Sequence, residues 1–351
     1  MSALDTYVRD VRRAARVGRE PAPDDGAVQV DAARARWRRQ HVTHAARRLP
    51  PASYGAAAWG GLQDSVPRAG LLGLHARIEA AAPDAWEDTR LVQIWLRWAD
   101  YIVPRDDVAV FTVGALPRDP AYVAALERLA DDVLDLLVAG RRGSRPVRDG
   151  LPDLPPSFVR AAAVTGRVHI RWDTRTTEIV GADRPDVDAE DARRQLCRRF
   201  LHWHGPAGPQ HFARWAGVTS ADAATTWQAV TPEMAAVDDE ARGRWILASD
   251  LDAVLAAERP SGVRLLPDGD PCLVVDPPAP PAAVPRKLLY TLTGRLVVDG
   301  DVVGGWGRRG AEVALAPWSP LSRRRRSAIE TEAAGLATPI GRPITIRWLV
   351  T

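Results

Sequence analysis

The sequence predicts a mostly helical α+β fold of tandem winged-helix units, each a helix-turn-helix followed by a β-wing, with a β-rich element at the C-terminus. Two observations predict the units. The stretch Arg198–Val218 indicates a basic helix, a turn at Gly205-Pro206 and a short amphipathic segment, and a further helix follows at Ala221–Val230. Upstream, a helix at Ser157–Val164 precedes two β-like segments. A third observation, apolar segments separated by Gly-containing turns after residue 285, predicts the C-terminal strands.

The N-terminal 140 residues are predicted to contain five helices of stated range, a sixth helix that follows Pro104–Asp107, and one short strand. Apolar residues recur at helical spacing, most clearly from residue 121 to residue 139. Pro50-Pro51 ends the second helix, and carboxylates after Pro104 suit the start of another helix. The predicted helices are Leu4–Val17, Ala32–Arg48, Ala69–Ala82, Leu91–Trp98 and Ala121–Ala139, and the strand is Tyr101–Val103.

The remaining elements follow two Pro-rich segments. Arg141–Pro156 has the composition of a linker, and Asp276–Pro285 that of a stiff polyproline-like loop. Arg167–Trp172 and Thr176–Val180 are predicted to form a wing hairpin. The C-terminal strands are predicted at Leu289–Leu292, Leu296–Val298, Val302–Trp306, Val313–Ala316 and Thr345–Val350, with a helix at Arg323–Leu336.

These elements group into four parts. Residues 1–140 form an N-terminal winged-helix unit, and residues 141–187 form a linker and a second unit. Residues 188–275 form a third unit, and residues 276–351 form the C-terminal β-rich element with one helix. A chain of 351 residues is long enough for several such cores.

Composition places the chain among cytoplasmic proteins. No apolar run approaches the roughly 20 residues that span a bilayer, and the N-terminus lacks an apolar secretory signal. Cys197 and Cys272 are too few for a disulfide framework. We find no Walker loop, dinucleotide fingerprint or nucleophile elbow, and we expect no cofactor.

Charge is segregated along the chain although the net charge is only +3. The segments Ala32–Gln63, Arg193–Ala221 and Val313–Ile329 contain no Asp or Glu. Nearly all basic residues are arginines, whose planar fork suits phosphate and guanine edges, although Arg-rich usage also follows genomic base composition. A helix-turn-helix in an acid-free segment predicts binding to double-stranded DNA. We also expect a monomer that is associated with the nucleoid.

Five sequence blocks stand out along the chain: Gly60–Gln63, Leu91–Arg97, Gly205–Ala207 with Phe212–Gly217, Leu265–Pro271 and Val298–Trp306. In this order they resemble the winged-helix family of AlkZ/YcaQ-like bacterial DNA glycosylases. The resemblance implies three tandem winged helices around a concave DNA channel and the excision of alkylated bases. It places the short catalytic motif at Gln63-Asp64-Ser65, where Ser65 replaces the second Gln or Asp of the family.

The resemblance and the charge pattern together give the candidate residues. Gln63 would orient the attacking water, with Asp64 or Ser65 assisting. An alternative is structural: Asp64 or Ser65 caps the helix that begins near Pro67. The expected DNA-binding arginines are Arg68, Arg77, Arg97, Arg198, Arg199, Arg214, Arg323 and Arg324.

Several alternatives remain at this stage. A base-excising lyase needs an amine for a Schiff base, and Lys287 and the N-terminal amine lie in no recognised motif, so a monofunctional glycosylase is expected. His202, His204 and His211 are expected to bind no metal. Most tryptophans are expected in the core, with Trp98 and Trp203 as exceptions. The competing function is a non-catalytic DNA-binding protein or regulator, and an interaction scaffold without DNA is disfavoured by the acid-free segments.

Overall fold

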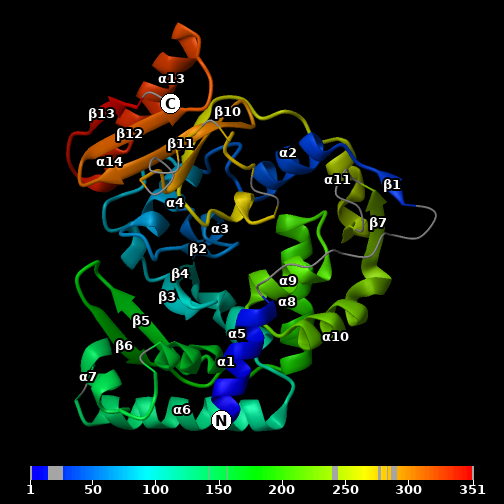
Figure 1. Cartoon of the computed structure of the whole chain (residues 1–351), viewed down its shortest axis with the longest axis vertical. Helices are drawn as coiled ribbons and strands as arrows, with labels where there is room; N and C mark the ends of the chain where they lie inside the picture. Colours follow the sequence, from blue (N-terminus) through cyan, green and yellow to red (C-terminus); the bar gives the residue numbers. More distant parts are fainter. Residues whose placement is uncertain are drawn as a thin grey trace. The chain divides into compact units, whose positions relative to one another are not determined.

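The computed structural model describes residues 2–14, 27–140, 142–155, 157–238, 244–275, 278–282, 284–285 and 291–349. Its contacts divide the chain into two compact units, each built from separate segments. Unit 1 holds Met1–Val30 and Val92–Asp252, and unit 2 holds Asp31–Leu91 and Ala253–Thr351. Figure 1 shows helices and strands in both, so the chain is mixed α/β. The four-part division drawn from the sequence stays a prediction.

Unit 1 is mainly helical. Its longer helices begin at well-formed caps: Asp119 accepts from the backbone of Ala121, and Asp188 accepts from the backbone of Asp191. The helices are α1 (Ala3–Ala14), α5 (Val108–Thr112), α6 (Pro120–Val138), α7 (Ser144–Asp149), α8 (Ala189–His204), α9 (Pro209–Ala216) and α10 (Ser220–Val230), with 3-10 segments at Arg105–Asp107, Val113–Ala115, Phe158–Thr165, Thr231–Glu233 and Ala248–Asp250. Helix α11 (Leu251–Leu255) spans the boundary between the units.

The predicted helical run in the third part is confirmed as α8, α9 and α10. Its core is aromatic: the ring of Phe200 lies 5.5 Å from that of Phe212 and 5.3 Å from that of Trp215. A hairpin of β7 (Met234–Asp238) and β8 (Arg244–Leu247) follows α10, and β1 (Val28–Gln29) pairs in parallel with β7. The sequence analysis did not anticipate this hairpin.

The predicted helix at Leu91–Trp98 is wrong, because this segment is strand β3 (Leu91–Leu96). All six of its residues are buried, including the polar Gln93, and a short run that is buried throughout carries no period that separates a strand from a helix. Arg97 and Trp98 both have positive φ (52° and 65°) and turn the chain into β4 (Ala99–Pro104). Two such residues are what a two-residue type I′ hairpin turn requires. The strand predicted at Tyr101–Val103 is confirmed within β4.

The hairpin predicted at Arg167–Trp172 and Thr176–Val180 is confirmed as β5 (Val168–Trp172) and β6 (Thr177–Gly181), which pair antiparallel; its role as a wing stays a prediction. Strand β5 also pairs with β3 through Gln93 and Ile170, so the order β4-β3-β5-β6 forms one sheet in this unit. The predicted linker contains the short helix α7, and the helix predicted at Ser157–Val164 is a 3-10 segment.

Unit 2 is built on a β-sheet with the order β13-β12-β11-β10-β9 among its described residues. All its pairs are antiparallel except β12 with β13, which α13 and α14 connect. The strands are β9 (Val263–Leu266), β10 (Gly294–Val298), β11 (Asp301–Arg309), β12 (Glu312–Pro317) and β13 (Thr345–Trp348); the helices are α2 (Ala32–Val42), α3 (Tyr54–Ala57), α4 (Ala69–Arg77), α13 (Arg323–Gly335) and α14 (Ala337–Ile340), with 3-10 segments at Ala85–Glu87 and Pro271–Leu273.

This sheet confirms most C-terminal elements of the sequence analysis. The strands predicted at Leu296–Val298, Val302–Trp306 and Val313–Ala316 lie within β10, β11 and β12. In the segment predicted as Leu289–Leu292, residues 291 and 292 are not in a strand, and the other two lie outside the described residues. Helices α2 and α4 end earlier than expected, at Val42 and Arg77.

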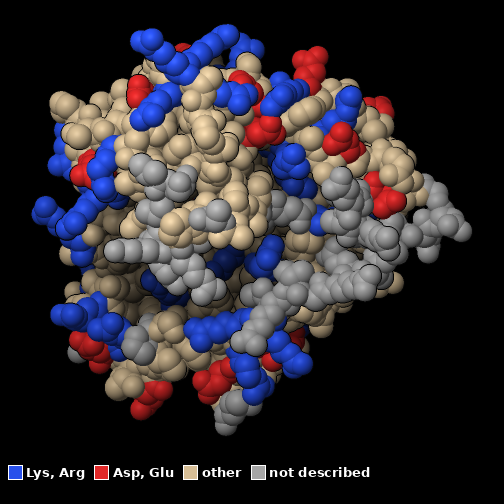
Figure 2. Space-filling model, turned by 45° about the horizontal axis from the view of Figure 1, so that its top comes forward, with Lys and Arg blue, Asp and Glu red and all other residues tan. Residues whose placement is uncertain are grey.

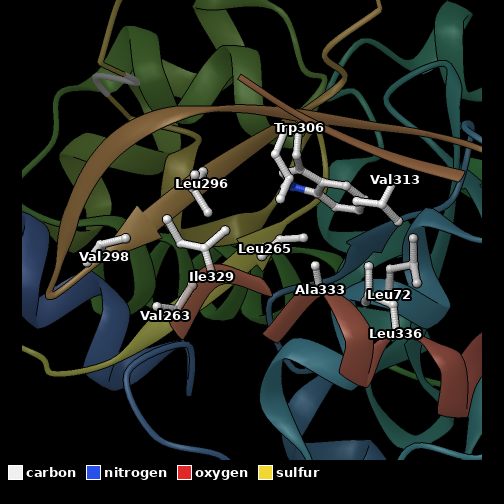
Figure 3. Packing of buried hydrophobic residues seen from close by; sticks show 11 residues of the cluster. Leu72, Val263, Leu265, Leu296, Val298, Trp306, Val313, Ile329, Ala333 and Leu336 are labelled. Atoms are coloured by element: carbon white, nitrogen blue, oxygen red, sulfur yellow. The ribbon is translucent and has the colours of Figure 1, made fainter. Parts of the chain in front are cut away.

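The sheet of unit 2 is buried on both faces. Leu265 and Leu296 face a cluster that includes Trp306 of β11 and Ile329 of α13, as Figure 3 shows. Leu266 and Val297, one residue on, belong to a second cluster with Ala45, Ala76 and Cys272. Because successive residues of a strand point to opposite faces, α13 covers one face, and the segments that carry Ala45 and Cys272 cover the other. Helix α4 contributes to both clusters, through Leu72 to the first and through Ala76 to the second.

Candidate active site and nucleic-acid-contacting arginines

Gln63 lies at the end of β2 (Leu62–Gln63) and is half-buried against the backbone of Gly269. A Cβ atom built on Gly269 would lie 2.8 Å from Cδ of Gln63, and closer still to its Oε1. Gly269 has φ of +70°, a conformation that favours glycine. Two sequence blocks, Gly60–Gln63 and Leu265–Pro271, therefore meet at this amide.

Asp64 lies at the start of the α4 region and is fully buried. Its Oδ1 accepts a hydrogen bond of 2.7 Å from the backbone N–H of Gly70, in the first turn of α4. This is the capping geometry that the sequence offered as an alternative to catalysis, because the carboxylate satisfies an otherwise unpaired helix amide. Ser65, the next residue, is exposed.

Pro267–Asp270 forms the turn that carries Gly269. The backbone N–H of Asp270 donates to the carbonyl of Pro267 at 3.3 Å, which closes the turn. Its carboxylate accepts two hydrogen bonds from the guanidinium of Arg77, at 2.7 and 2.8 Å, and both side chains are at most 1% exposed. The pair joins the end of α4 to this turn.

Arg77 is therefore a structural residue rather than a DNA contact. Its Nε also donates to the carbonyl of Thr43, and the neighbouring Asp270 carboxylate raises its pKa against the lowering effect of burial. A guanidinium enclosed in this way presents no donor to phosphate. Arg77 is therefore not proposed as a DNA-binding arginine.

A cavity of about 270 Å³ lies next to the Gln63 motif in unit 2. Its lining includes Val66 and Pro67 of the motif loop, which is the segment of residues 64–68 between β2 and α4. It also includes Pro267 and Asp268 of the turn and Trp306 of β11. Arg308, also in the lining, donates at 2.7 Å to the carbonyl of Pro67 and so ties the motif loop to β11. Burial lowers the pKa of Arg308, and Arg342 lowers it further. Reasoning from the sequence missed Asp268, Gly269 and Arg308 as site residues, although the Pro-Asp-Gly turn was a visible signal.

Arg97 is held in unit 1 between aromatic rings. Its guanidinium carbon lies 4.0 Å from the ring centre of Trp215 and 4.8 Å from that of Tyr101. Gly217, which ends α9 with φ of +71°, packs against the Arg97 backbone, where a Cβ would meet Cα of Arg97 at 3.4 Å. Burial lowers the pKa of Arg97. Arg97 thus locks the β3–β4 turn onto the end of α9.

The arginines of α8 are already paired with acids. Arg198 donates twice to Glu233, at 2.8 and 2.7 Å, and Arg199 lies 2.7 Å from Asp107. These acids come from other parts of unit 1, so the acid-free stretch of sequence is not acid-free in space. Arg214 is partly buried in α9.

The arginines of α13 are more open. Arg323 and Arg324 are exposed, and no ion pair to either occurs within the described ranges, whereas Arg325 lies 3.5 Å from Asp299. Arg68 lies over the ring of Trp86, its guanidinium carbon 3.7 Å from the ring centre. On the face drawn in Figure 2, basic side chains form several groups separated by acidic and uncharged surface.

The histidines and tryptophans are mainly structural. His202 Nδ1 lies 2.9 Å from Asp250, and His204 is fully buried between aromatic rings. Within the described residues, no group of three His, Cys, Asp or Glu has the geometry of a metal site. Trp203, expected as an exception, is buried in the core, while Trp98 is partly exposed at the β3–β4 turn. Trp95, Trp215 and Trp306 are buried as predicted.

His75 lies in α4, six residues after the start of the helix, and is buried without a hydrogen-bond partner on either ring nitrogen among the described residues. Burial, with Arg48 and Arg264 nearby, lowers its pKa to about 4. The imidazole is therefore neutral at physiological pH, and it contributes no positive charge to the surroundings of the motif.

Comparison with known proteins identifies the family. The AlkZ-like DNA glycosylase family matches residues 56–338, and this chain belongs to that family. The match includes the Gln63 motif, the Pro267–Asp270 turn and parts of both units. It thus places the chain in the class of DNA glycosylases.

Two relatives come from Streptomyces sahachiroi. The interstrand DNA cross-link repair glycosylase is 28% identical over 165 residues, which are 44% of this chain and 44% of that protein. The solved structure of the DNA glycosylase AlkZ has a TM-score of 0.70 at 17% identity and covers 92% of this chain and 100% of that one. The second comparison shows a shared fold. Separately, none of the helices described here is long and apolar enough to cross a bilayer.

Proposed function

We propose that this protein is a monofunctional DNA glycosylase that hydrolyses the N-glycosidic bond of alkylated bases in double-stranded DNA. The observation that carries the proposal is the placement of Gln63. Its half-buried amide lies against Gly269, and Asp268, the residue before that glycine, lines the cavity of about 270 Å³. Gln63 is also the residue to which the resemblance assigns the catalytic glutamine. The relative whose name specifies interstrand cross-link repair supports a bulky or cross-linked adduct as substrate.

The proposed reaction needs little acid assistance. An alkylated base that carries a positive charge leaves as a neutral molecule when the bond from its nitrogen to C1′ breaks and the bonding electrons go to that nitrogen. The sugar then has oxocarbenium character, and a water molecule attacks C1′. Gln63 supplies an oriented amide to hold this water, an interaction that strengthens as charge develops on the sugar.

We propose a monofunctional mechanism because the chain offers few amines that could form a Schiff base. A lyase step requires a Schiff base, and Lys287 is the only lysine of the chain. It lies in no block shared with the family and outside the described residues. Hydrolysis by water is consistent with a motif built from an amide and a hydroxyl.

DNA binding is proposed through winged-helix units. Helices α8 to α10 followed by the β7–β8 hairpin have the element order of such a unit, and β5–β6 supplies a second hairpin. Arg68, Arg214, Arg323 and Arg324 are proposed as phosphate contacts, and Arg97 as a support for the α9 surface. Arg198 and Arg199 remain candidates only if DNA displaces their carboxylate partners.

The test is single-turnover release of a methylated base from duplex DNA. Gln63→Ala should lower the release rate by about 10²–10³-fold, because it removes one oriented transition-state interaction, and should leave DNA affinity within about threefold. Asp84→Asn, which changes an exposed polar side chain of unit 2 outside the proposed site and the proposed DNA contacts, is the control and should behave as wild type. A Gln63→Ala variant as fast as wild type would contradict the assignment.

A non-catalytic DNA-binding function is the second candidate. It is favoured by the replacement of the second motif residue with Ser65 and by the use of Asp64 as a helix cap. Wild-type protein that binds DNA but releases no base from methylated or cross-linked duplexes would support it.

A further inference from the structure

We propose that Asp268 supplies the catalytic carboxylate that the Gln63-Asp64-Ser65 motif lacks. The inference rests on the proposed glycosylase function and names a further residue for the same site. It assigns Asp268 to the general-base step, in which the attacking water loses a proton.

The carboxylates of Asp64 and Asp270, which also lie in the motif and in the turn, already have hydrogen-bond partners. Asp64 is fully buried and accepts from the backbone of Gly70, and Asp270 is buried with Arg77. Ser65 has a short neutral side chain, which cannot take a proton from water at neutral pH. A carboxylate for this site must therefore come from another residue near Gln63.

Asp268 has the required position. It is the second residue of the Pro267–Asp270 turn, which places it at the apex, and it is exposed. It precedes Gly269, the residue against which the Gln63 amide lies, and it lines the cavity beside the motif loop. Among the described residues, no hydrogen bond or ion pair engages its carboxylate, so the charge is available to a substrate.

The turn also explains why the carboxylate stays in place. Asp270 anchors one end of the turn through its two hydrogen bonds to Arg77, and Pro267 is buried at the other end. Arg308 fixes the facing motif loop through the carbonyl of Pro67. The apex carboxylate and the motif loop thus line the same cavity from anchored segments.

In the proposed step, water oxygen forms a bond to C1′ as the bond from C1′ to the base nitrogen breaks. The electron pair of that bond moves to the base, which neutralises its positive charge. A proton of the water passes to Asp268 and then to solvent, so atoms and charges balance without a cofactor. The negative carboxylate also stabilises the positive charge that develops on the sugar.

The experiment measures single-turnover base release from methylated duplex DNA, with DNA affinity and melting temperature for each variant. Asp268→Asn should lower the release rate by at least about 10²-fold, the usual contribution of a general base, with affinity and melting temperature close to wild type. Asp84→Asn, which changes another exposed carboxylate of unit 2, should have no effect. Adding Ser65→Asp to the Asp268→Asn variant should restore part of the rate, because it supplies a carboxylate at the position the family uses.

The outcomes separate this inference from the proposed function. Wild-type release with an equally fast Asp268→Asn variant would overturn the role of Asp268 and leave the glycosylase function standing. A wild-type protein that releases no base would overturn the proposed function itself. A slow Asp268→Asn variant that also melts at a lower temperature and is not rescued by Ser65→Asp would show a structural role and overturn the inference.

Discussion

Gly269 serves the candidate site through the absence of a side chain. Its positive φ and its contact with the Gln63 amide both exclude a Cβ atom. The structure thereby gives a physical reason for the Asp-Gly pair in the block Leu265–Pro271: the glycine lets Gln63 approach, and the aspartate before it reaches the cavity.

Gly269→Ala is predicted to displace the Gln63 amide and to lower base release by about 10²-fold, as loss of one oriented catalytic group does. The strained backbone adds a stability cost of about 1 kcal/mol. Gly262→Ala is the control: its φ is +92°, and a Cβ there meets nothing within 4 Å. Single-turnover kinetics and thermal melts of both variants check this, and equal release rates in the two variants would contradict it.

At the level of residues, the sequence predicted the motif but not the partners of its charges. Asp64 as a helix cap was an explicit alternative, because an aspartate before an apolar helix is a recognisable pattern. The pairing of Arg198 with Glu233 was invisible, since 35 residues separate the two and only the fold brings them together. Arg77 was misjudged for the same reason, because its partner Asp270 lies 193 residues away.

Helix α4 and the Pro267–Asp270 turn are linked by one buried ion pair, and this link supports the site. Arg77 and Asp270 satisfy one another with two hydrogen bonds, and Asp270 also accepts from the backbone of Cys272. A buried charge that loses its partner is costly, whereas exposed pairs contribute little.

Asp270→Asn is therefore predicted to lower the free energy of unfolding by about 3–5 kcal/mol, because the Arg77 charge stays buried without a carboxylate. Glu312→Gln, which disrupts the exposed pair with Arg347, should cost no more than about 1 kcal/mol. Denaturant unfolding of both variants gives the comparison. A loss below 1 kcal/mol for Asp270→Asn would show that the pair does not hold the turn.

Elements whose apolar residues recur with a clear period, or that are bounded by recognisable turn residues, were predictable from the sequence. Elements without either signal were not. The C-terminal strands are short apolar segments separated by turns at Asp299-Gly300 and Arg309-Gly310, and these turns made most of the sheet predictable. Strand β3 is buried along its whole length, and its turn at Arg97-Trp98 contains neither Gly nor Asn, so the usual hairpin signal was missing. Of the candidate site, the Gln63-Asp64-Ser65 motif followed from the resemblance, whereas strand β2 and the contact of Gln63 with the Pro267–Asp270 turn did not.

For the whole molecule, the small net charge conceals differences among arginines that only the structure distinguishes. Arg323 and Arg324 are exposed on α13 and form no ion pair within the described residues, while Arg198 and Arg199 of α8 are paired with Glu233 and Asp107. Binding through phosphates releases counterions, so the log of affinity falls with the log of salt by about 0.9 per phosphate neutralised.

Replacing Arg323 and Arg324 with Ser is predicted to weaken binding to all DNA sequences alike and to reduce the salt slope by up to about 2. Replacing Arg198 and Arg199 with Ala should reduce it by less, because those guanidinium groups must first leave Glu233 and Asp107. Fluorescence anisotropy of a labelled duplex at several salt concentrations measures both slopes. A larger effect of the α8 pair would reverse this ranking.

The segments of the two units are synthesised in an order that determines when each unit can complete its core. The chain passes between the units at residues 30–31, 91–92 and 252–253, so residues 31–91 are synthesised first and their partners from 253 onward last. Unit 1 can complete its core during this interval. Leu72 of unit 2 packs against strands β9 to β12, which are synthesised later, so this part of the core of unit 2 forms only after them. The Gln63 amide therefore acquires its support only late in synthesis, and no contiguous fragment of the gene encodes either unit alone.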